Sequence, residues 1–227
     1  ITSIPSIETY NNVQNKKYRH IKIFKRFNNY PLPMTKIINL NINKIKDKFI
    51  SDETVNYVNR FLKKNEQVLF FINRRGYAPY LICNKCGFKQ ICSNCSMYLT
   101  FHKTKNKAIC HHCGLERKIK NKCKKEGECK FIMYGPGVEK IFEEVKKIFP
   151  NNKVEIFSSD YTKKKDQTIS LFEKIKNNSI DILIGTQMIS KGFNFPKLNC
   201  IVVVDADFSG RGYDLRTTEK NIQLYHQ

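Results

Sequence analysis

Eight cysteines in a segment of fewer than fifty residues constrain this chain more than any other feature. Two residues between ligands let one tight turn direct both sulfurs at a single tetrahedral ion, and three of the four cysteine pairs have that spacing. The pairs are Cys83–Cys86, Cys92–Cys95, Cys110–Cys113 and Cys123–Cys129. Because eight thiolates fill two tetrahedral shells, the spacing predicts two closed, structural zinc sites.

The spacing leaves two questions about these sites open. Five residues separate Cys123 from Cys129, so this pair would chelate less rigidly, and a histidine could replace a cysteine. The candidate histidines are His102, His111 and His112. Spacing also does not fix which pairs share an ion. A nested arrangement would combine the first pair with the last and the second with the third.

Composition limits where the protein works and what it binds. Nine cysteines could form disulfides in a secreted protein, but knuckle spacing and the lack of an export signal favour a reducing cytoplasm. The sequence contains no run of 18 apolar residues, so it predicts no membrane span. The formal net charge is +21, which attracts polyanions such as nucleic acid. Alternatively, the positive charge reflects only a general abundance of Lys, Asn and Ile and indicates no particular partner.

Outside the cysteine segment, the hydrophobic pattern alternates between strands and helices. Helices are predicted from an N-cap at Ser51, over 138–149, around 169–175 and over 217–226. The predicted apolar strands are Val68–Ile72, Phe131–Tyr134, Val154–Phe157, Ile182–Ile184 and Ile201–Val204. A half-exposed strand is predicted over 21–27 and another short strand over 37–42. Continuous apolar strands between helices predict an α/β domain with a parallel core sheet. Cys200 stands alone beside the last strand and is predicted to be core packing.

Polar residues follow four of these strands, where open parallel sheets bind ligands. The four segments are Asn73–Gly76, Ser158–Asp160, Thr186–Gln187 and Asp205–Asp207. Arg74 and Arg75 could contact a DNA phosphate or pair with Asp160. Asp205 and Asp207 are expected to orient loops by hydrogen bonds rather than to bind metal.

Aromatic and lysine-rich stretches allow two interpretations each. Aromatics among lysines can stack on single-stranded bases or form the small core of a zinc module. The aromatics are Tyr77, Phe88, Tyr98 and Phe101. The lysine runs at 122–130 and 163–165 could be solvated faces or phosphate contacts, which would weaken with salt.

Several long motifs together resemble one family. They are the NRRGYAP run at 73–79 leading into CNKCG at 83–87, CHHCG at 110–114 and DILIGTQMISKG at 181–192. Asp205-Ala206-Asp207, Asp214, Arg216, Glu219 and Gln223 also fit. The chain is similar, essentially from end to end, to the bacterial PriA family of primosomal replication-restart DNA helicases of superfamily 2.

The resemblance implies a RecA-like second motor lobe interrupted by the zinc-binding insertion. Residues 1–50 would end the first motor lobe and connect the two, 51–82 would start the second lobe, 83–129 would be the two-zinc insertion, and 130–227 would continue the lobe until motif VI. The resemblance also favours the nested pairing. One ion would then be held by Cys83, Cys86, Cys123 and Cys129, and the other by Cys92, Cys95, Cys110 and Cys113.

The resemblance further assigns roles to motor residues. Thr186, Gln187, Lys191 and Gly192 would belong to motif V, which couples the ATP cleft to the DNA track. Residues 2–6 would be a diverged motif III, and Gln227 would begin motif VI. The chain has no GxxxxGK[ST] loop and starts with isoleucine, so it is expected to be part of a longer protein.

The implied function is that of an ATP-dependent 3′–5′ DNA helicase acting at stalled forks. It would require ATP and Mg²⁺, and its partners would be forked DNA, primosome proteins and single-strand binding protein in the bacterial cytoplasm, near the nucleoid. Without the Walker motifs this chain alone is expected to be inactive as an ATPase. The alternative is a non-enzymatic zinc-dependent docking module, a remnant of gene decay.

Overall fold

The computed structural model describes most of the chain, in two compact units. The described residues are 4–24, 31–42, 45, 48–73, 77–119, 122–123, 125, 127–158, 161, 165–190, 194–207 and 216–226. One unit combines residues 1–43 with 209–227, and the other comprises 44–208. The domain boundaries inferred from the sequence stay predictions. No helix among the described residues has the length and apolarity needed to span a membrane.

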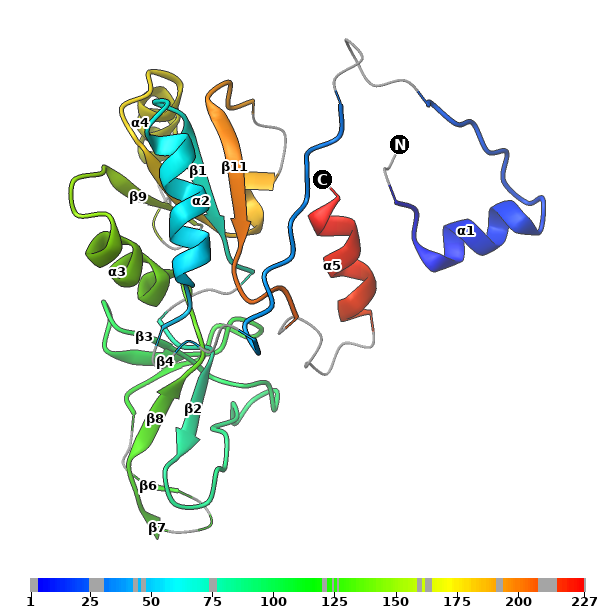
Figure 1. Ribbon diagram of the computed structural model, residues 1–227. Helices are drawn as coiled ribbons and strands as arrows, with labels where there is room; N and C mark the ends of the chain where they lie inside the picture. Colours follow the sequence, from blue (N-terminus) through cyan, green and yellow to red (C-terminus); the bar gives the residue numbers. More distant parts are fainter. Residues whose placement is uncertain are drawn as a thin grey trace. The chain divides into compact units, whose positions relative to one another are not determined.

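A four-stranded parallel sheet organises the larger unit (Figure 1). Its strands, in spatial order, are β11 (Leu198–Val203), β1 (Gln67–Phe71), β10 (Ile182–Gly185) and β9 (Val154–Phe157). All three neighbouring pairs are parallel. The structure therefore confirms the α/β class and the parallel core sheet.

Three helices flank this sheet, and all three are confirmed predictions. They are α2 (Asp52–Leu62), α3 (Val138–Ile148) and α4 (Lys165–Lys176). A short 3₁₀ turn, η2 (Gln187–Ser190), follows β10. Gly185 ends β10 without a side chain, and a Cβ there would lie 3.1 Å from Ile189 of that turn and 3.2 Å from Leu69. Close packing of the turn on the sheet therefore explains this glycine.

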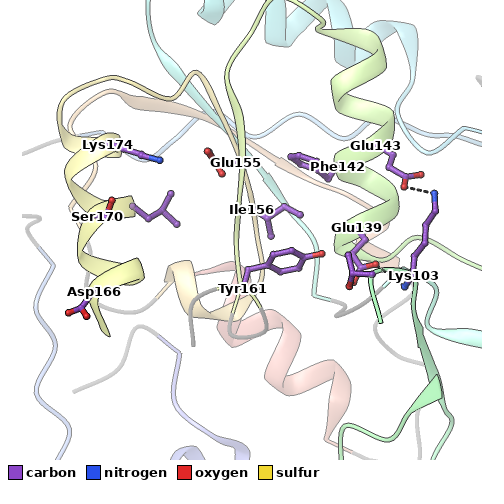
Figure 2. A pocket seen from close by; sticks show the side chains of 12 residues that line it. Lys103, Glu139, Phe142, Glu143, Glu155, Ile156, Tyr161, Asp166, Ser170 and Lys174 are labelled. Atoms are coloured by element: carbon purple, nitrogen blue, oxygen red, sulfur yellow. Dashed lines mark hydrogen bonds and ion pairs between the residues drawn. The ribbon is translucent and has the colours of Figure 1, made fainter. Parts of the chain in front are cut away.

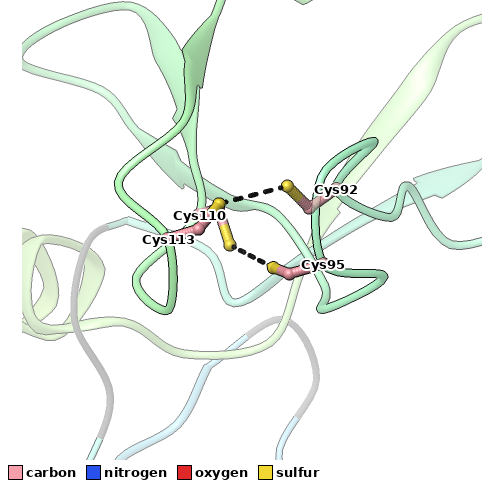
Figure 3. A group of neighbouring side chains, drawn as sticks. All are labelled: Cys92, Cys95, Cys110 and Cys113. Carbon is pink, nitrogen blue, oxygen red and sulfur yellow. Dashed lines mark hydrogen bonds between the residues drawn. The ribbon is translucent and has the colours of Figure 1, made fainter.

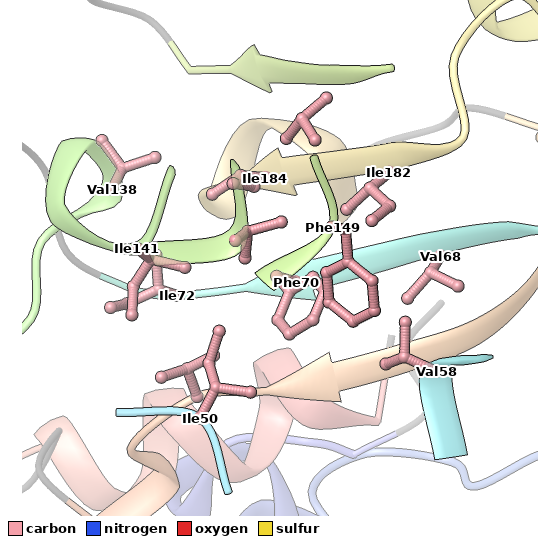
Figure 4. Packing of buried hydrophobic residues seen from close by; sticks show 13 residues of the cluster. Ile50, Val58, Val68, Phe70, Ile72, Val138, Ile141, Phe149, Ile182 and Ile184 are labelled. Atoms are coloured by element: carbon pink, nitrogen blue, oxygen red, sulfur yellow. The ribbon is translucent and has the colours of Figure 1, made fainter. Parts of the chain in front are cut away.

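The main core lies between one face of the sheet and helices α2 and α3 (Figure 4). Alternate residues of β1 and β10 point into it. The central members are Val58, Val68, Phe70, Ile72, Val138, Ile141, Ile182 and Ile184. The Phe70 and Phe149 rings pack with centroids 6.5 Å apart. This core depends on apolar burial, and none of the eight cysteines between Cys83 and Cys129 belongs to it.

The sequence predicted a strand at Phe131–Tyr134 as part of the parallel sheet. A strand forms there, but the prediction of its sheet is wrong. This strand is β8 (Phe131–Tyr134), and it pairs antiparallel with β2 (Tyr80–Cys83) in a separate two-stranded ribbon. Its side chains alternate between half-buried and exposed. A four-residue apolar run does not distinguish these two environments, so only the partner strand decides between them.

The cysteine segment contains short strands that the sequence did not predict. A three-stranded antiparallel sheet contains β3 (Thr100–His102), β4 (Lys107–Ile109) and β5 (Glu116–Arg117). A second hairpin pairs β6 (Lys122–Cys123) with β7 (Gly127–Glu128). We refer to residues 77–134 as the zinc module. Its strands have two to four residues, too few to show a periodic hydrophobic pattern.

The described part of the smaller unit contains helix α1 (Ile7–Gln14) and helix α5 (Thr217–Tyr225). Helix α5 confirms a prediction, whereas α1 was missed. An ion pair joins Glu8 to Arg216, and the Ile7 backbone N–H donates to Glu219 over 3.0 Å. The strands predicted over 21–27 and 37–42 are wrong where described, because residues 21–24 and 37–42 form no strand.

The N-terminus of α2 offers a test of local stability. The Ser51 side-chain oxygen accepts a hydrogen bond from the Thr54 backbone N–H over 3.2 Å, and Ser51 is only 4% exposed. Replacing Ser51 with alanine is expected to lower the free energy of unfolding by about 1 kcal/mol, since a buried helix N–H loses its partner. Urea denaturation followed by circular dichroism measures this, with Ser179→Ala, in an exposed loop, as the control. Equal losses in both variants would contradict the prediction.

Candidate metal centre

Four cysteine sulfurs from two distant knuckles converge in the zinc module (Figure 3). The Sγ atoms of Cys92, Cys95, Cys110 and Cys113 all lie within 4.8 Å of one another. The Cys92–Cys113 distance is 3.5 Å and the Cys95–Cys110 distance is 3.4 Å. Four sulfurs bound tetrahedrally at about 2.3 Å would be separated by about 3.8 Å. The group therefore fits a single zinc ion after small adjustments.

Backbone hydrogen bonds shape these two knuckles independently of a metal ion. The Cys110 N–H donates to the Leu115 carbonyl over 2.9 Å, and the Gly114 N–H donates to the Cys110 carbonyl over 2.9 Å. Gly114 has φ of +78°, a conformation that other residues rarely adopt. In the other knuckle, the Asn94 N–H points at the Cys92 sulfur over 3.4 Å. Such N–H donors stabilise a thiolate, which is the form that binds zinc.

A second group combines the first and last cysteine pairs. The sulfurs of Cys83, Cys86 and Cys123 lie within 4.8 Å of one another, with Cys86 and Cys123 3.6 Å apart. Cys129 is 7% exposed and packs with Cys83 and Cys123 in one buried cluster. The structure thus brings together the sets of the nested arrangement, with Cys129 at the edge of its set.

The histidines do not join either sulfur group. His102 and His111 instead contact each other, with 2.9 Å between their Nε2 atoms, while His112 is exposed. Within the described part of the chain, the groups able to hold a metal ion consist of cysteines alone.

The pKa values of the thiols reflect their crowding. Burial raises the pKa of Cys92, but N–H groups of its own knuckle and neighbouring thiols outweigh burial and lower that pKa to about 7; the same causes lower the pKa of Cys83 to about 7. A backbone N–H lowers the pKa of Cys95, yet burial and the other thiols raise it to about 12. Burial and two neighbouring thiols raise the pKa of Cys129 to about 11. In each group, the thiol with the lowered pKa therefore loses its proton more readily than those with a raised pKa, and a divalent cation would favour the thiolate form of its ligands.

A buried carboxylate joins the zinc module to helix α3, which packs on the parallel sheet. We refer to the parallel sheet with helices α2, α3 and α4 as the parallel lobe. Glu139 is 5% exposed and accepts hydrogen bonds from the Lys103 backbone N–H over 3.0 Å and from the Thr104 hydroxyl over 3.5 Å. Its Oε1 atom also lies 3.4 Å from Nδ1 of His102, the histidine that contacts His111 in the CHHCG knuckle. No sequence pattern indicated this link, because His102 and Glu139 are 37 residues apart and a glutamate in a first helical turn is common.

The same junction borders a cavity of about 700 Å³ (Figure 2). Helices α3 and α4 and strand β9 form its walls, and Lys103 and Thr104 of the zinc module also line it. The Nζ atom of Lys103 pairs with Glu143 of α3 at 2.5 Å. Its lining mixes carboxylates with apolar side chains, including Phe142, Ile156 and Tyr161.

Glu139 and Glu143 are a matched pair for testing this junction. Replacing Glu139 with alanine is expected to lower the free energy of unfolding by about 1–3 kcal/mol, because it leaves the buried His102 ring and the Lys103 backbone N–H without this partner. Replacing Glu143, whose ion pair is exposed, is expected to cost about 0–1 kcal/mol. Urea denaturation of both variants provides the comparison. A smaller loss for Glu139→Ala than for Glu143→Ala would contradict this account.

The carboxyl ends of the parallel strands meet at one edge of the sheet, as predicted. The registers align Phe71 with Gly185 and with Val203, and Gly185 with Phe157. The residues that follow these strands therefore lie at the same edge. Among them Thr186 is 5% exposed, and its carbonyl accepts the Ile189 N–H at the start of η2.

Several residues assigned from the sequence lie outside the described residues. They are Thr2, Ser3, Arg74, Arg75, Asp160, Lys163, Lys164, Lys191, Gly192, Asp214 and Gln227. Their predicted roles stay predictions.

The other candidates have ordinary structural surroundings where they are described. Phe101 is 3% exposed, and Tyr77 and Phe88 pack against the module's buried clusters. Cys200 packs on the main core, as expected. Asp205 adopts a left-handed backbone conformation with φ of +54°, which suits a turn after β11.

The parallel sheet and the group of four converging cysteines define an α/β protein with a cysteine cluster able to hold zinc. Comparison with known proteins is more specific. Residues 92–118 match the model for the Cys-rich region domain of PriA DNA helicase. The whole chain is 41% identical to the replication restart protein PriA of Rickettsia felis, and 35% and 28% identical to the proteins of that name from Haemophilus influenzae and Bacillus subtilis.

The resemblance to the PriA family is therefore confirmed along the whole chain. The chain spans 35%, 31% and 28% of the lengths of these three relatives.

Proposed function

We propose that this chain is the zinc-bearing second motor lobe of an ATP-dependent 3′–5′ DNA helicase that recognises stalled forks and restarts replication by primosome assembly. The observation that carries the proposal is the similarity over the full chain to proteins named replication restart protein PriA. The parallel sheet supports it, since motor lobes bind ligands at the carboxyl ends of such strands. The division at 51–82, 83–129 and 130–227 is part of this proposal.

Two structural zinc ions complete the zinc module in this proposal. Cys92, Cys95, Cys110 and Cys113 hold one ion. The other is held by Cys83, Cys86, Cys123 and Cys129. Zinc supplies tetrahedral cross-links between distant knuckles, and all positions are filled by sulfur, so it takes no part in catalysis.

Motif V residues connect nucleotide and DNA in the complete motor. Thr186 and Gln187 follow β10 at the carboxyl edge of the sheet, which supports their role, and Lys191, Gly192 and Gln227 are assigned by the family motifs alone. ATP and Mg²⁺ bind with residues that this chain lacks, since it contains no GxxxxGK[ST] loop. The chain by itself then hydrolyses no ATP.

The partners follow from the same assignment. The charge of +21 supports forked DNA with single-stranded and duplex arms as the main ligand, with Arg74 and Arg75 as candidate phosphate contacts. Primosome proteins and single-strand binding protein are the proposed protein partners. The proposed compartment is the bacterial cytoplasm, at the nucleoid.

The test uses the complete protein that contains this chain. It is expected to bind about two zinc ions, to hydrolyse ATP faster with forked DNA, and to unwind the fork. Thr186→Ala is expected to reduce unwinding more than DNA binding, whereas Ser179→Ala should leave both unchanged. A zinc-loaded protein that binds DNA but never hydrolyses ATP would favour the non-enzymatic docking module instead.

A further inference from the structure

One face of the β2–β8 ribbon carries two large side chains from β8 that are open to solvent, whereas on the same face Tyr80 of β2 is only 5% exposed and Ile82 is half-buried. The register pairs Tyr80 with Tyr134 and Ile82 with Ile132, so these four side chains point to the same side. Ile132 is 54% exposed and Tyr134 is 55% exposed. The opposite side, by contrast, is covered by the module's own clusters, through Leu81, Cys83, Phe131 and Met133. We call the open side the ribbon face.

An ordered lysine borders the ribbon face at one edge. Lys89 forms an antiparallel bridge with Ile82, which places it beside the ribbon. Its Nζ atom lies 4.7 Å from the centre of the Tyr80 ring and 5.4 Å from that of Tyr98. Two aromatic rings hold this exposed cation in place, and the rings themselves pack edge to face, 5.1 Å apart.

A second lysine, Lys130, lies directly before β8 and extends its row of exposed side chains. Lys130 is exposed and precedes Ile132 by two residues, so strand alternation puts Lys130, Ile132 and Tyr134 on one side. Two hydrogen bonds of 3.0 Å with Asn84, one to the Lys130 carbonyl and one from its N–H, fix its backbone. Cation, aliphatic and aromatic side chains thus follow one another along the strand, about 6.7 Å apart.

The positive charge of the surrounding zinc module favours an anionic ligand. Residues 77–134 contain twelve lysines and arginines and three glutamates. The balance stays positive with two tetrathiolate zinc sites included. A duplex presents phosphates but keeps its base faces stacked, whereas a single strand offers base faces to exposed rings.

We propose that the ribbon face binds single-stranded nucleic acid. A base stacks on Tyr134 and packs against Ile132, while Lys89 and Lys130 contact the flanking phosphates. The proposal rests on the proposed function and deepens it, because it assigns single-strand binding to named residues of the zinc module.

Anisotropy of a fluorescein-labelled thymidine oligonucleotide with the zinc-loaded chain tests the proposal. Tyr134→Ala is expected to weaken binding about tenfold with the same salt dependence, because it removes one stacking contact. Tyr134→Phe keeps the ring and is expected to bind as the unchanged chain does. Lys130→Gln should instead reduce the slope of log affinity against log salt by about 0.7, the value for one phosphate contact.

The matched control is Tyr10→Ala, since Tyr10 is 56% exposed on α1 and outside the module. It is expected to leave affinity unchanged. Zinc content measured for every variant verifies that the module is folded. If Tyr134→Ala and Lys130→Gln bind like the unchanged chain, the proposed binding of single strands by the ribbon face is refuted. DNA binding by the protein would still stand. If the unchanged, zinc-loaded chain does not bind the oligonucleotide at low salt, the DNA-binding part of the proposed function fails as well.

Discussion

Replacing Cys110 with serine is expected to reduce bound zinc from about two ions per chain to about one. Cys110 is 0% exposed, lies 3.4 Å from the Cys95 sulfur and belongs to the buried cluster of the module. Serine cannot supply the fourth thiolate, and binding of a structural zinc ion contributes about 10–16 kcal/mol in small zinc modules. The β3–β4–β5 sheet should therefore unfold.

Elemental analysis and thiol alkylation measure this effect together. In the unchanged chain the eight module cysteines should resist alkylation, whereas in Cys110→Ser the three remaining thiols of that group should react. Helices α2 and α3 should stay protected in hydrogen exchange, because their core is apolar. Cys200→Ser is the matched control, since Cys200 lies outside both sulfur groups, and it should keep both ions. Two ions retained by Cys110→Ser would refute the assigned ligand set.

Replacing Phe70 with alanine is expected to lower the free energy of unfolding of the parallel lobe by about 3–5 kcal/mol. Phe70 is 0% exposed in the middle of β1 and packs on Phe149 beneath α3. The substitution removes apolar burial and leaves a cavity that the surrounding strands cannot close. A loss of this size is comparable to the whole stability of many domains.

Guanidinium denaturation followed by helix content provides the measurement. Phe24→Ala is the matched control, because Phe24 is 86% exposed, and its expected change is within about 0.5 kcal/mol. Zinc content of Phe70→Ala in the absence of denaturant should stay near that of the unchanged chain, since the zinc module has its own sulfur-centred cores. A change below about 1 kcal/mol for Phe70→Ala would contradict the position of the main core.

Sequence patterns predicted the parallel lobe well because its elements are long enough to show their periods. The predicted N-cap at Ser51 caps α2, and the apolar positions of 138–149 form the buried side of α3. Four of the five continuous apolar strands lie in the parallel sheet. The cysteine spacing likewise indicated which pairs could chelate, because a two-residue gap dictates a turn.

Patterns failed where strands were short or exposed. Residues 131–134 have the same apolar character as 182–184, yet β8 lies in an antiparallel ribbon with one open face. The half-exposed strands expected at 21–27 and 37–42 form no strand where described, and α1 forms nearby instead. Alternation over a few residues is a weak signal when no partner strand is known.

The sequence by itself indicated the cysteine pairs that could chelate, the class of the main domain and the family to which the chain is similar, because turn spacing and hydrophobic period are local properties. Only the tertiary structure decided which knuckles meet, since sulfurs of Cys92 and Cys113 approach within 3.5 Å through folding of the module. It likewise placed the Glu139 carboxylate against His102 and left Tyr134 open to solvent. Contacts between residues far apart in the chain depend on how the elements pack, and no local pattern encodes them.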